Sequence, residues 1–398
     1  MATTADRRSI GIIGMGDMGK MYAQRLSQAG WRVNACDRPT NYDALKQEFA
    51  SDVGAIVGGQ TSCKAPELAA FDKYLPDDVE IISCHSLHGP NVNPKGHPLV
   101  LIQHRASDES LRFVERIFST FQSKYVYLSG DLHDRITADT QAVTHAAFLS
   151  MGTAWHANNQ FPWEVARYVG GIENVKINIT LRIYANKWHV YAGLAILNPA
   201  AKKQIRQYAQ SVTDLFKLML GGHREELRAR VKTAGAAVFK SDTMQHDLLL
   251  RDDVLDRFSL SKGNSERMPN NHLSLLAIVD CWWKLGIVPY DHMICSTPLF
   301  RLWLGVTEYL FRNEDLLNEV LDIAIDDNTF RSDDLEFTFA ARAWSECVSF
   351  GDFASYRDRF EKIQSYFSPR FPEAVRLGNE MMKTILDKTT TKATMSSS

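Results

Sequence analysis

The residues best suited to catalysis lie in two short polar segments, 60–64 (QTSCK) and 85–90 (HSLHGP). Each segment follows a short apolar run, so each is expected at the end of a strand. A neutral imidazole held in place by a nearby hydroxyl can accept the proton of an alcohol while hydride leaves the same carbon. His85 is therefore the candidate base of a dehydrogenase, and the alternative is that it only caps a loop.

Two other chemistries suggested by these segments are disfavoured. His85 and His88 have the spacing of half a metal site, but no carboxylate or cysteine partner accompanies them in their loop, so no metal is predicted. Cys63 and Cys84 stand beside the polar residues, and we expect them to be small buried fillers rather than nucleophiles.

A glycine-rich turn near the N-terminus predicts nucleotide binding. The strand-like run 9–13 is followed by GMGDMG, an amphipathic stretch over 17–29, a second strand over 31–36 and the acidic Asp37. In this order a GxGxxG turn holds a dinucleotide, with the pyrophosphate at the N-terminus of the helix. The candidate cofactor-binding residues are Gly14, Met15, Gly16, Asp17, Met18, Gly19, Asp37 and Arg38. Asp37 favours NAD and Arg38 favours NADP, and the residues leave this choice open.

The segment after Asp37 is too short for a complete nucleotide-binding sheet. Only 17 residues separate it from the next predicted strand, which begins at Ala55, whereas a strand–helix–strand unit needs about 30 or more. The first domain is thus expected to be α/β and Rossmann-like but to lack at least one strand. Its other predicted elements are helices over 42–49 and 109–122 and strands over 81–84, 98–103 and 125–128.

Beyond about residue 131 helical patterns dominate, and they contain a repeat. Four residues recur after a displacement of 127 residues: His145, Trp155, Pro162 and Trp163 return as His272, Trp282, Pro289 and Tyr290. A duplication would place two modules of a dimer in one chain, so we expect an all-α region in a monomer with an internal pseudo-dimer, or a homodimer. The predicted domains are 1–130 (truncated dinucleotide-binding domain), 131–262 (first helical repeat), 263–386 (second helical repeat) and 387–398 (disordered tail).

Four polar residues of the helical region are candidates for substrate contacts. Gln141 and His145 are one helical turn apart and can face the same cleft, although a lone helical histidine is more often a satisfied core residue. Arg182 and Arg301 lie in apolar surroundings, where an unpaired guanidinium is costly. Each arginine is therefore expected to pair with a carboxylate of the protein or with one brought by a ligand.

Composition and charge argue against several classes of protein. The 398 residues carry a formal net charge of -2 and are 45% hydrophobic, which is typical of a globular protein and lacks the basic excess of nucleic-acid binders. The six cysteines form no CxxC pair, and no apolar run approaches the roughly 18 to 20 residues that span a bilayer. We expect a cytoplasmic protein with a small-molecule substrate and without nucleic-acid or membrane partners.

Several long motifs resemble those of prephenate dehydrogenase, most closely the fungal NADP-linked type. They are GIIGMGDMG, IVGGQTSCK, HSLHGP, HDRITADTQAVTHAAFLSMG, LRIYANKWHVYAGLAI and HLSLLAIVD with the later YDHMICSTPLFR. The resemblance implies oxidative decarboxylation of prephenate to 4-hydroxyphenylpyruvate and CO2 with reduction of NADP, a step of tyrosine biosynthesis. NAD stays the alternative cofactor.

The same resemblance assigns roles to individual residues. His85 of HSLHGP matches the catalytic histidine of the family, and Ser62 of QTSCK matches the serine that hydrogen-bonds that histidine and the substrate. Gln141 and His145 of QAVTH match residues that line the prephenate pocket.

The resemblance leaves two matters open. Arg301 looks like the carboxylate-binding arginine of the family and Arg182 like its counterpart in the other repeat, and either could face the substrate. Family members also have additional strands and a loop after the position of Asp37, and their absence here would impair cofactor binding. The alternative functions are another NAD(P)-dependent dehydrogenase of the β-hydroxyacid type, or a catalytically impaired relic that acts as a binding protein.

Overall fold

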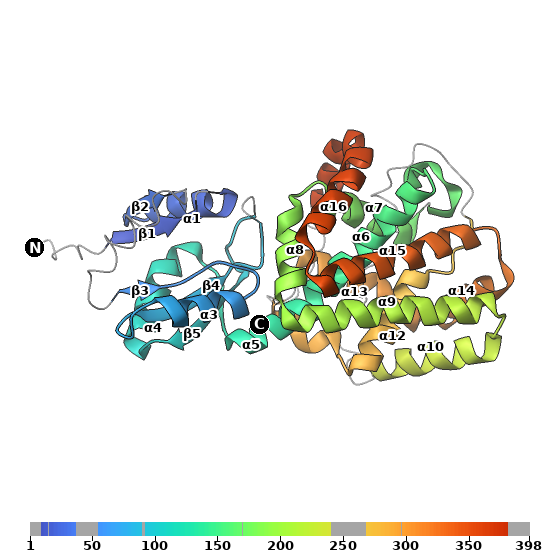
Figure 1. Cartoon of the computed structure of the whole chain (residues 1–398), viewed down its shortest axis with the longest axis horizontal. Coiled ribbons are helices and arrows are strands. Elements are labelled where there is room, and N and C mark those ends of the chain that lie inside the picture. The colour runs from blue at the N-terminus through green and yellow to red at the C-terminus, as the bar shows by residue number, and fades with distance from the viewer. Residues whose placement is uncertain are drawn as a thin grey trace, which may run out of the picture. The chain divides into compact units, whose positions relative to one another are not determined.

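The computed structural model describes residues 9–14, 16–36, 55–89, 92–168, 170–239, 268–295 and 297–380. Contacts between residues divide the chain into two units, Met1–His133 and Asp134–Ser398 (Figure 1). No helix in the described part of the chain is both long enough and apolar enough to cross a membrane.

The first unit contains two β-sheets. β1 (Ser9–Ile13) and β2 (Arg32–Cys36) form a parallel pair, and α1 (Asp17–Gln28) connects them. The second sheet has the order β3-β4-β5-β6, in which only the pairing of β4 with β5 is antiparallel. Its strands are β3 (Ile56–Val57), β4 (Glu80–His85), β5 (Pro98–Arg105) and β6 (Lys124–Tyr127), and the unit also contains helices α3 (Ala65–Tyr74) and α4 (Asp108–Phe118).

Within the described ranges, no ladder of hydrogen bonds joins the two sheets of the first unit. The predicted α/β character of this domain and its shortage of strands are therefore confirmed. The antiparallel direction of β5 was not predicted, because an apolar strand pattern carries no information about strand direction. The helix expected over 42–49 lies outside the described residues.

Apolar side chains of α1 build the core of the first unit. Met21, Tyr22 and Leu26 are buried on one face of this helix. The buried residues that share their core are Ile82, Cys84, Leu99, Leu101, Val114 and Phe121. The rings of Tyr22 and Phe121 meet edge-to-face with their centroids 4.7 Å apart. Because α1 thereby shares a core with β4 and β5, this core positions both the glycine turn that begins α1 and the end of β4.

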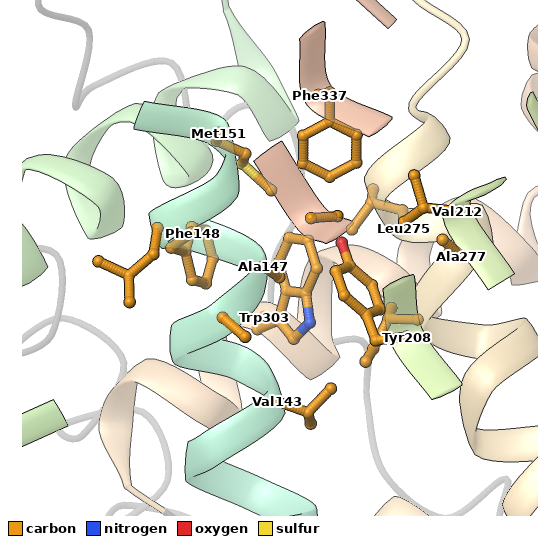
Figure 2. Packing of buried hydrophobic residues seen from close by; sticks show 14 of the residues in the cluster. Val143, Ala147, Phe148, Met151, Tyr208, Val212, Leu275, Ala277, Trp303 and Phe337 are labelled. Carbon is orange, nitrogen blue, oxygen red and sulfur yellow. The ribbon is translucent and has the colours of Figure 1, made fainter. Parts of the chain in front are cut away.

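The described part of the second unit is helical. Its core includes Trp303, which lies between Phe148 and Tyr208 in Figure 2, and the rings of Trp303 and Phe148 have their centroids 4.7 Å apart. The helices from the unit boundary onward are α5 (Gly130–Thr137), the π-helical turn η3 (Ala138–Ala142), α6 (Val143–Ala157), η4 (Pro162–Glu164), η5 (Ala166–Tyr168), α7 (Gly171–Tyr184), α8 (Trp188–Leu197), α9 (Pro199–Leu220), α10 (Arg224–Val238), α12 (Leu273–Leu285), η8 (Pro289–Cys295), α13 (Pro298–Arg312), α14 (Glu314–Asp326), α15 (Arg331–Phe350), α16 (Phe353–Phe367) and η9 (Ser368–Arg370).

These helices recur in the same order after the displacement of 127 residues seen in the sequence. The matching pairs are α6 and α12, η4 and η8, α7 and α13, α8 and α14, α9 and α15, and α10 and α16. Packing crosses between the two halves, since α6 packs on α15, α12 packs on α9, and α9 packs against α15. Each half thus completes the core of the other, as two subunits of an intertwined dimer would.

The two arginines of the repeat are not equivalent. Arg182 lies in the last turn of α7, whereas Arg301 lies in the first turn of α13. The displacement of 127 residues places Asn174 at the position equivalent to Arg301 and Tyr309 at the position equivalent to Arg182. The prediction that the arginines are counterparts is therefore wrong. The helical pattern identified the correct pair of helices but not the turn on which each arginine lies.

Candidate active site

The glycine turn at the start of α1 has the geometry that a pyrophosphate requires. Gly14 has φ +92°, a left-handed conformation that favours glycine. A Cβ atom on Gly19 would lie 1.9 Å from the carbonyl oxygen of Gly14, whereas a Cβ on Gly16 would meet nothing within 4 Å. Gly16 is the N-cap of α1 and has no capping side chain, so the positive end of the helix dipole is open to an anion. These residues fit a dinucleotide cofactor.

The other predicted cofactor-binding residues contribute less. Asp17 lies in the first turn of α1, and Met18 packs against the core of the first unit. Met15, Asp37 and Arg38 lie outside the described residues, so their proposed contacts stay predictions.

His85, the predicted base, is the last residue of β4 and is partly exposed. Its Nδ1 lies 2.8 Å from Nε2 of His133, a buried residue of α5. Burial holds the pKa of His85 well below its ordinary value, and the neighbouring His133, Lys64 and His88 lower it further. The imidazole is therefore neutral at physiological pH and can accept a proton.

A buried lysine that the sequence analysis missed holds the segment 60–64 against β4. The Nζ of Lys64 donates to the carbonyl oxygen of Cys84 at 2.8 Å, to Oγ of Ser83 at 2.9 Å and to Oε1 of Glu67 at 3.0 Å. The lysine side chain is fully buried, and so is nearly all of its carboxylate partner. Because Cys84 directly precedes the base, these contacts fix the backbone from which His85 projects.

Ser62, the other predicted catalytic residue, lies in the same turn and is half-buried. The atom that the structure pairs with Nδ1 of His85 belongs to His133, so the expected hydrogen bond between Ser62 and His85 stays a prediction. Cys63 and Cys84 are buried, as predicted for fillers. Burial raises the pKa of the Cys84 thiol to about 12, so it is not a thiolate nucleophile at neutral pH.

Gln141 and His145 in the second unit bury polar atoms that have no hydrogen-bond partner among the described residues. These atoms are Nε2 of Gln141 and Nδ1 of His145. The His145 ring meets Tyr191 edge-to-face with the centroids 4.8 Å apart, and burial lowers the pKa of His145 to about 3. Unsatisfied buried polar groups are rare in proteins. Two such groups one turn apart indicate that a polar ligand supplies their partners.

The π-helical turn η3, which carries Gln141, is held by side chains from both halves of the repeat. The Asp139 carboxylate accepts a hydrogen bond from Gln204 of α9 and lies 3.0 Å from Nε2 of His292 in η8. π-helical turns are rare and are frequently found at functional sites. Residues 138–142 follow an ordinary helical pattern in the sequence, so this turn was not predicted.

The two predicted carboxylate-binding arginines are partly exposed and differ in their partners. Arg301 donates from Nη2 to the carbonyl oxygen of Met293 at 3.2 Å. Arg182 donates from Nη1 to Oδ1 of Asn379, and no carboxylate of the described residues pairs with it. Burial lowers the pKa of both guanidinium groups, so an anionic ligand beside either one would be stabilising.

The position equivalent to His145 in the second half is occupied by a buried ion pair. His272 lies with Nδ1 2.9 Å from Oε1 of Glu173 and 3.0 Å from Nζ of Lys176, and all three side chains are buried. Burial opposes ionisation of Glu173, but Lys176 and His272 lower its pKa to about 2. Nδ1 of His272 thus has partners within the protein, in contrast to Nδ1 of His145.

Two family models match separate parts of the chain. The model described as a 6-phosphogluconate dehydrogenase C-terminal domain matches residues 142–387. The model described as ketopantoate reductase PanE/ApbA matches residues 10–98. The first match covers most of the helical unit, and the second covers the glycine turn, the segment 60–64 and His85.

Two fungal proteins are similar to nearly the whole chain. The probable NADP(+) prephenate dehydrogenase of Schizosaccharomyces pombe is 55% identical over 422 residues, which cover 95% of this chain and 97% of that protein. The NADP(+) prephenate dehydrogenase of Saccharomyces cerevisiae is 52% identical over 425 residues, which cover 95% of this chain and 94% of that protein. Both alignments are longer than the 398 residues of this chain. Each relative therefore has residues without a counterpart here.

Similar solved structures are more distant. The prephenate dehydrogenase of Aquifex aeolicus in complex with hydroxyphenyl propionate and NAD+ is 17% identical with a TM-score of 0.42, over 62% of this chain and 100% of that one. The arogenate dehydrogenase of Synechocystis is 14% identical with a TM-score of 0.37, over 56% of this chain and 95% of that one.

Proposed function

The chain belongs to the prephenate dehydrogenase family, and from that premise we propose that it converts prephenate to 4-hydroxyphenylpyruvate and CO2 with reduction of NADP. The observation that carries the proposal is the neutral imidazole of His85 at the end of β4, in the same unit as a glycine turn that fits a dinucleotide. The names of the two fungal relatives favour NADP over NAD.

The cofactor would be held by the turn that contains Gly14, Gly16 and Gly19. NADP in its oxidised form supplies the hydride acceptor when bound. The open space over Gly16 leaves room for the pyrophosphate, and the first turn of α1 directs its dipole toward that space. Asp37 and Arg38 are proposed to contact the adenosine ribose and its 2′-phosphate.

The proton chemistry falls to His85. Neutral His85 takes the proton of the ring hydroxyl at Nε2 as hydride leaves the same carbon, and Ser62 is proposed to orient the base and the hydroxyl. The ring carboxylate then leaves as CO2, its electron pair enters the ring, and the aromatic phenol regains a proton. Formation of the aromatic ring makes the step strongly favourable.

The dianionic substrate requires polar contacts at its two carboxylates. We propose that the unpartnered Nε2 of Gln141 and the neutral His145 bind the substrate, since both present buried polar atoms without protein partners among the described residues. Arg301 is proposed to bind a carboxylate, and Arg182 is the second candidate for that role.

Replacement of the base tests the proposed function. His85→Asn keeps a polar side chain of similar size but removes the basic nitrogen, so we expect no measurable turnover and nearly unchanged prephenate binding. Cofactor reduction at 340 nm measures turnover, and titration calorimetry measures binding. Arg301→Ala should raise KM with little change in kcat, and the same change at Arg182 is the matched control. An active His85→Asn enzyme would overturn the assignment.

A second candidate function is a catalytically impaired relic that binds prephenate. The two unjoined sheets of the first unit favour this candidate, because a Rossmann domain normally binds its cofactor on one continuous sheet. Prephenate binding without reduction of NADP or NAD by the unaltered protein would support the relic and exclude the enzyme.

We also propose that the protein is a cytoplasmic monomer whose residues 131–262 and 263–386 form an internal pseudo-dimer. The repeated order of helices and the packing of each half on the other support this arrangement. No disulfide joins Cys63, Cys84, Cys281 or Cys347 in the described structure, which suits a reducing compartment. Sedimentation velocity tests the oligomeric state.

A further inference from the structure

The base has a histidine neighbour to which neither the sequence analysis nor the proposed reaction assigns a role. His133 lies in α5 and is 1% exposed. Its Nε2 is 2.8 Å from Nδ1 of His85, and the two rings meet at 65° with their centroids 5.0 Å apart. The backbone N–H of His133 donates to the carbonyl oxygen of Ser129 at 2.9 Å, so the ring projects from a formed helical turn.

The protonation of this pair has two alternatives, because each neutral imidazole has one N–H and one lone pair. If His85 donates from Nδ1–H, its Nε2 has a lone pair and can take a proton from a substrate. If His133 donates from Nε2–H, then His85 carries its own proton on Nε2 and cannot act as a base at that atom. Only the first arrangement is compatible with the proposed reaction.

We propose that His133 is a positioning residue, which accepts a hydrogen bond from Nδ1–H of His85 and so keeps Nε2 of His85 unprotonated and correctly oriented. This inference rests on the proposed function of His85. His133 itself touches neither substrate nor cofactor in this assignment, and it acts only through the ring of the base.

The same hydrogen bond strengthens during the reaction. When His85 has taken the proton, its Nδ1–H belongs to a cation, and hydrogen bonds from charged donors are about twice as strong as neutral ones. The charged groups nearest the base are Lys64, which is held by Glu67, and the titratable His88 and His133. Because Lys64 disfavours a positive charge on His85, an acceptor at Nδ1 matters most in the protonated state. Loss of His133 should therefore lower kcat rather than raise KM.

The unaltered protein provides the first test. Nitrogen-15 NMR of histidine-labelled enzyme without ligands reports which ring nitrogen of His85 carries the proton, and His85→Asn assigns its signals. We expect Nδ1–H for His85. A signal from Nε2–H would overturn the proposal without any effect of mutation on folding.

Three substitutions at one position provide the second test. His133→Gln places an amide oxygen near the position of Nε2 and can accept from Nδ1–H, whereas the shorter His133→Asn cannot reach it and His133→Leu has no acceptor. We expect kcat to fall about 10- to 100-fold in the Leu and Asn variants, as expected for the loss of a hydrogen bond to a charged group. KM should stay within about twofold, and His133→Gln should recover most of kcat.

The outcomes separate this inference from the proposed function. An active His85→Asn enzyme refutes the function, and the role of His133 fails with it. An inactive His85→Asn enzyme together with full kcat in His133→Leu refutes only the role of His133. Equal loss of kcat in the Gln and Leu variants, with raised KM in both, would show that His133 is merely structural.

Discussion

Two glycines in one turn should respond to the same substitution in opposite ways. In Gly19→Ala the added Cβ would lie 1.9 Å from the carbonyl oxygen of Gly14, and in Gly16→Ala it would meet no protein atom within 4 Å. Gly19 therefore maintains the contact between α1 and β1, whereas Gly16 keeps open the space that the pyrophosphate needs. The first change should damage the protein and the second should damage cofactor binding.

The size of each effect follows from these distances. Carbon and oxygen atoms in contact are normally more than 3 Å apart, so the Cβ of Gly19→Ala must displace backbone by about 1 Å, at a cost of about 1–3 kcal/mol. A cost of about 2 kcal/mol corresponds to roughly 30-fold faster hydrogen exchange in α1. Gly16→Ala changes only an N-cap, which costs less than about 1 kcal/mol. Its methyl group should weaken NADP binding at least about tenfold, because the pyrophosphate can no longer approach the backbone.

The assay compares both variants with the unaltered protein. Hydrogen exchange measured on peptides that cover α1 reports the local stability, and titration calorimetry with NADP reports the affinity. The reasoning is refuted if Gly19→Ala leaves exchange in α1 unchanged, or if Gly16→Ala binds NADP as tightly as the unaltered protein.

Three further predictions concern buried charge and the repeat. Lys64→Met leaves a buried carboxylate without its partner and should lower the free energy of unfolding by about 3–5 kcal/mol, whereas Lys73→Met on the exposed side of α3 should change it by less than about 0.5 kcal/mol; urea denaturation measures both. The pKa of His145 is about 3 in the folded protein and near its ordinary value in the unfolded chain, so the unfolded chain binds the proton first and stability falls as the pH drops below about 6.5. From pH 7 to pH 5 this group should account for a loss of about 2 kcal/mol, which urea denaturation should find missing in His145→Asn; equal losses in both proteins would contradict the assignment. Each chain should bind one prephenate in titration calorimetry, because Asn174 stands at the position equivalent to Arg301 and His272 is held in an ion pair; a stoichiometry of two would contradict this.

The part of the site that could be predicted depends on local chemistry. The glycine turn was recognisable because a left-handed backbone at Gly14 and a close approach at Gly19 restrict those positions to glycine. His85 was recognisable because a histidine after an apolar run belongs at the end of a strand. The 127-residue repeat was visible because duplication copies residue types as well as helices.

The part that was missed depends on contacts between distant segments. The pairing of His85 with His133 joins residues 48 positions apart, and the burial of Lys64 depends on β4, which follows about 20 positions later. The π-helical turn at Gln141 has no distinctive residue types, since its geometry is set by Asp139 and the side chains that contact it from α9 and η8. The equivalence of the two arginines was predicted wrongly for the same reason.

By itself, the amino-acid sequence determined the chemical inventory of this protein: a glycine turn, a base at a strand end, two helical copies and a first domain with too few residues for a full sheet. Only the tertiary structure decided which polar groups become partners and which stay unpaired. Backbone conformation and strand pattern arise from neighbouring residues, whereas burial, the lowered pKa of an imidazole and the tautomer it adopts arise from groups that folding brings together across the chain.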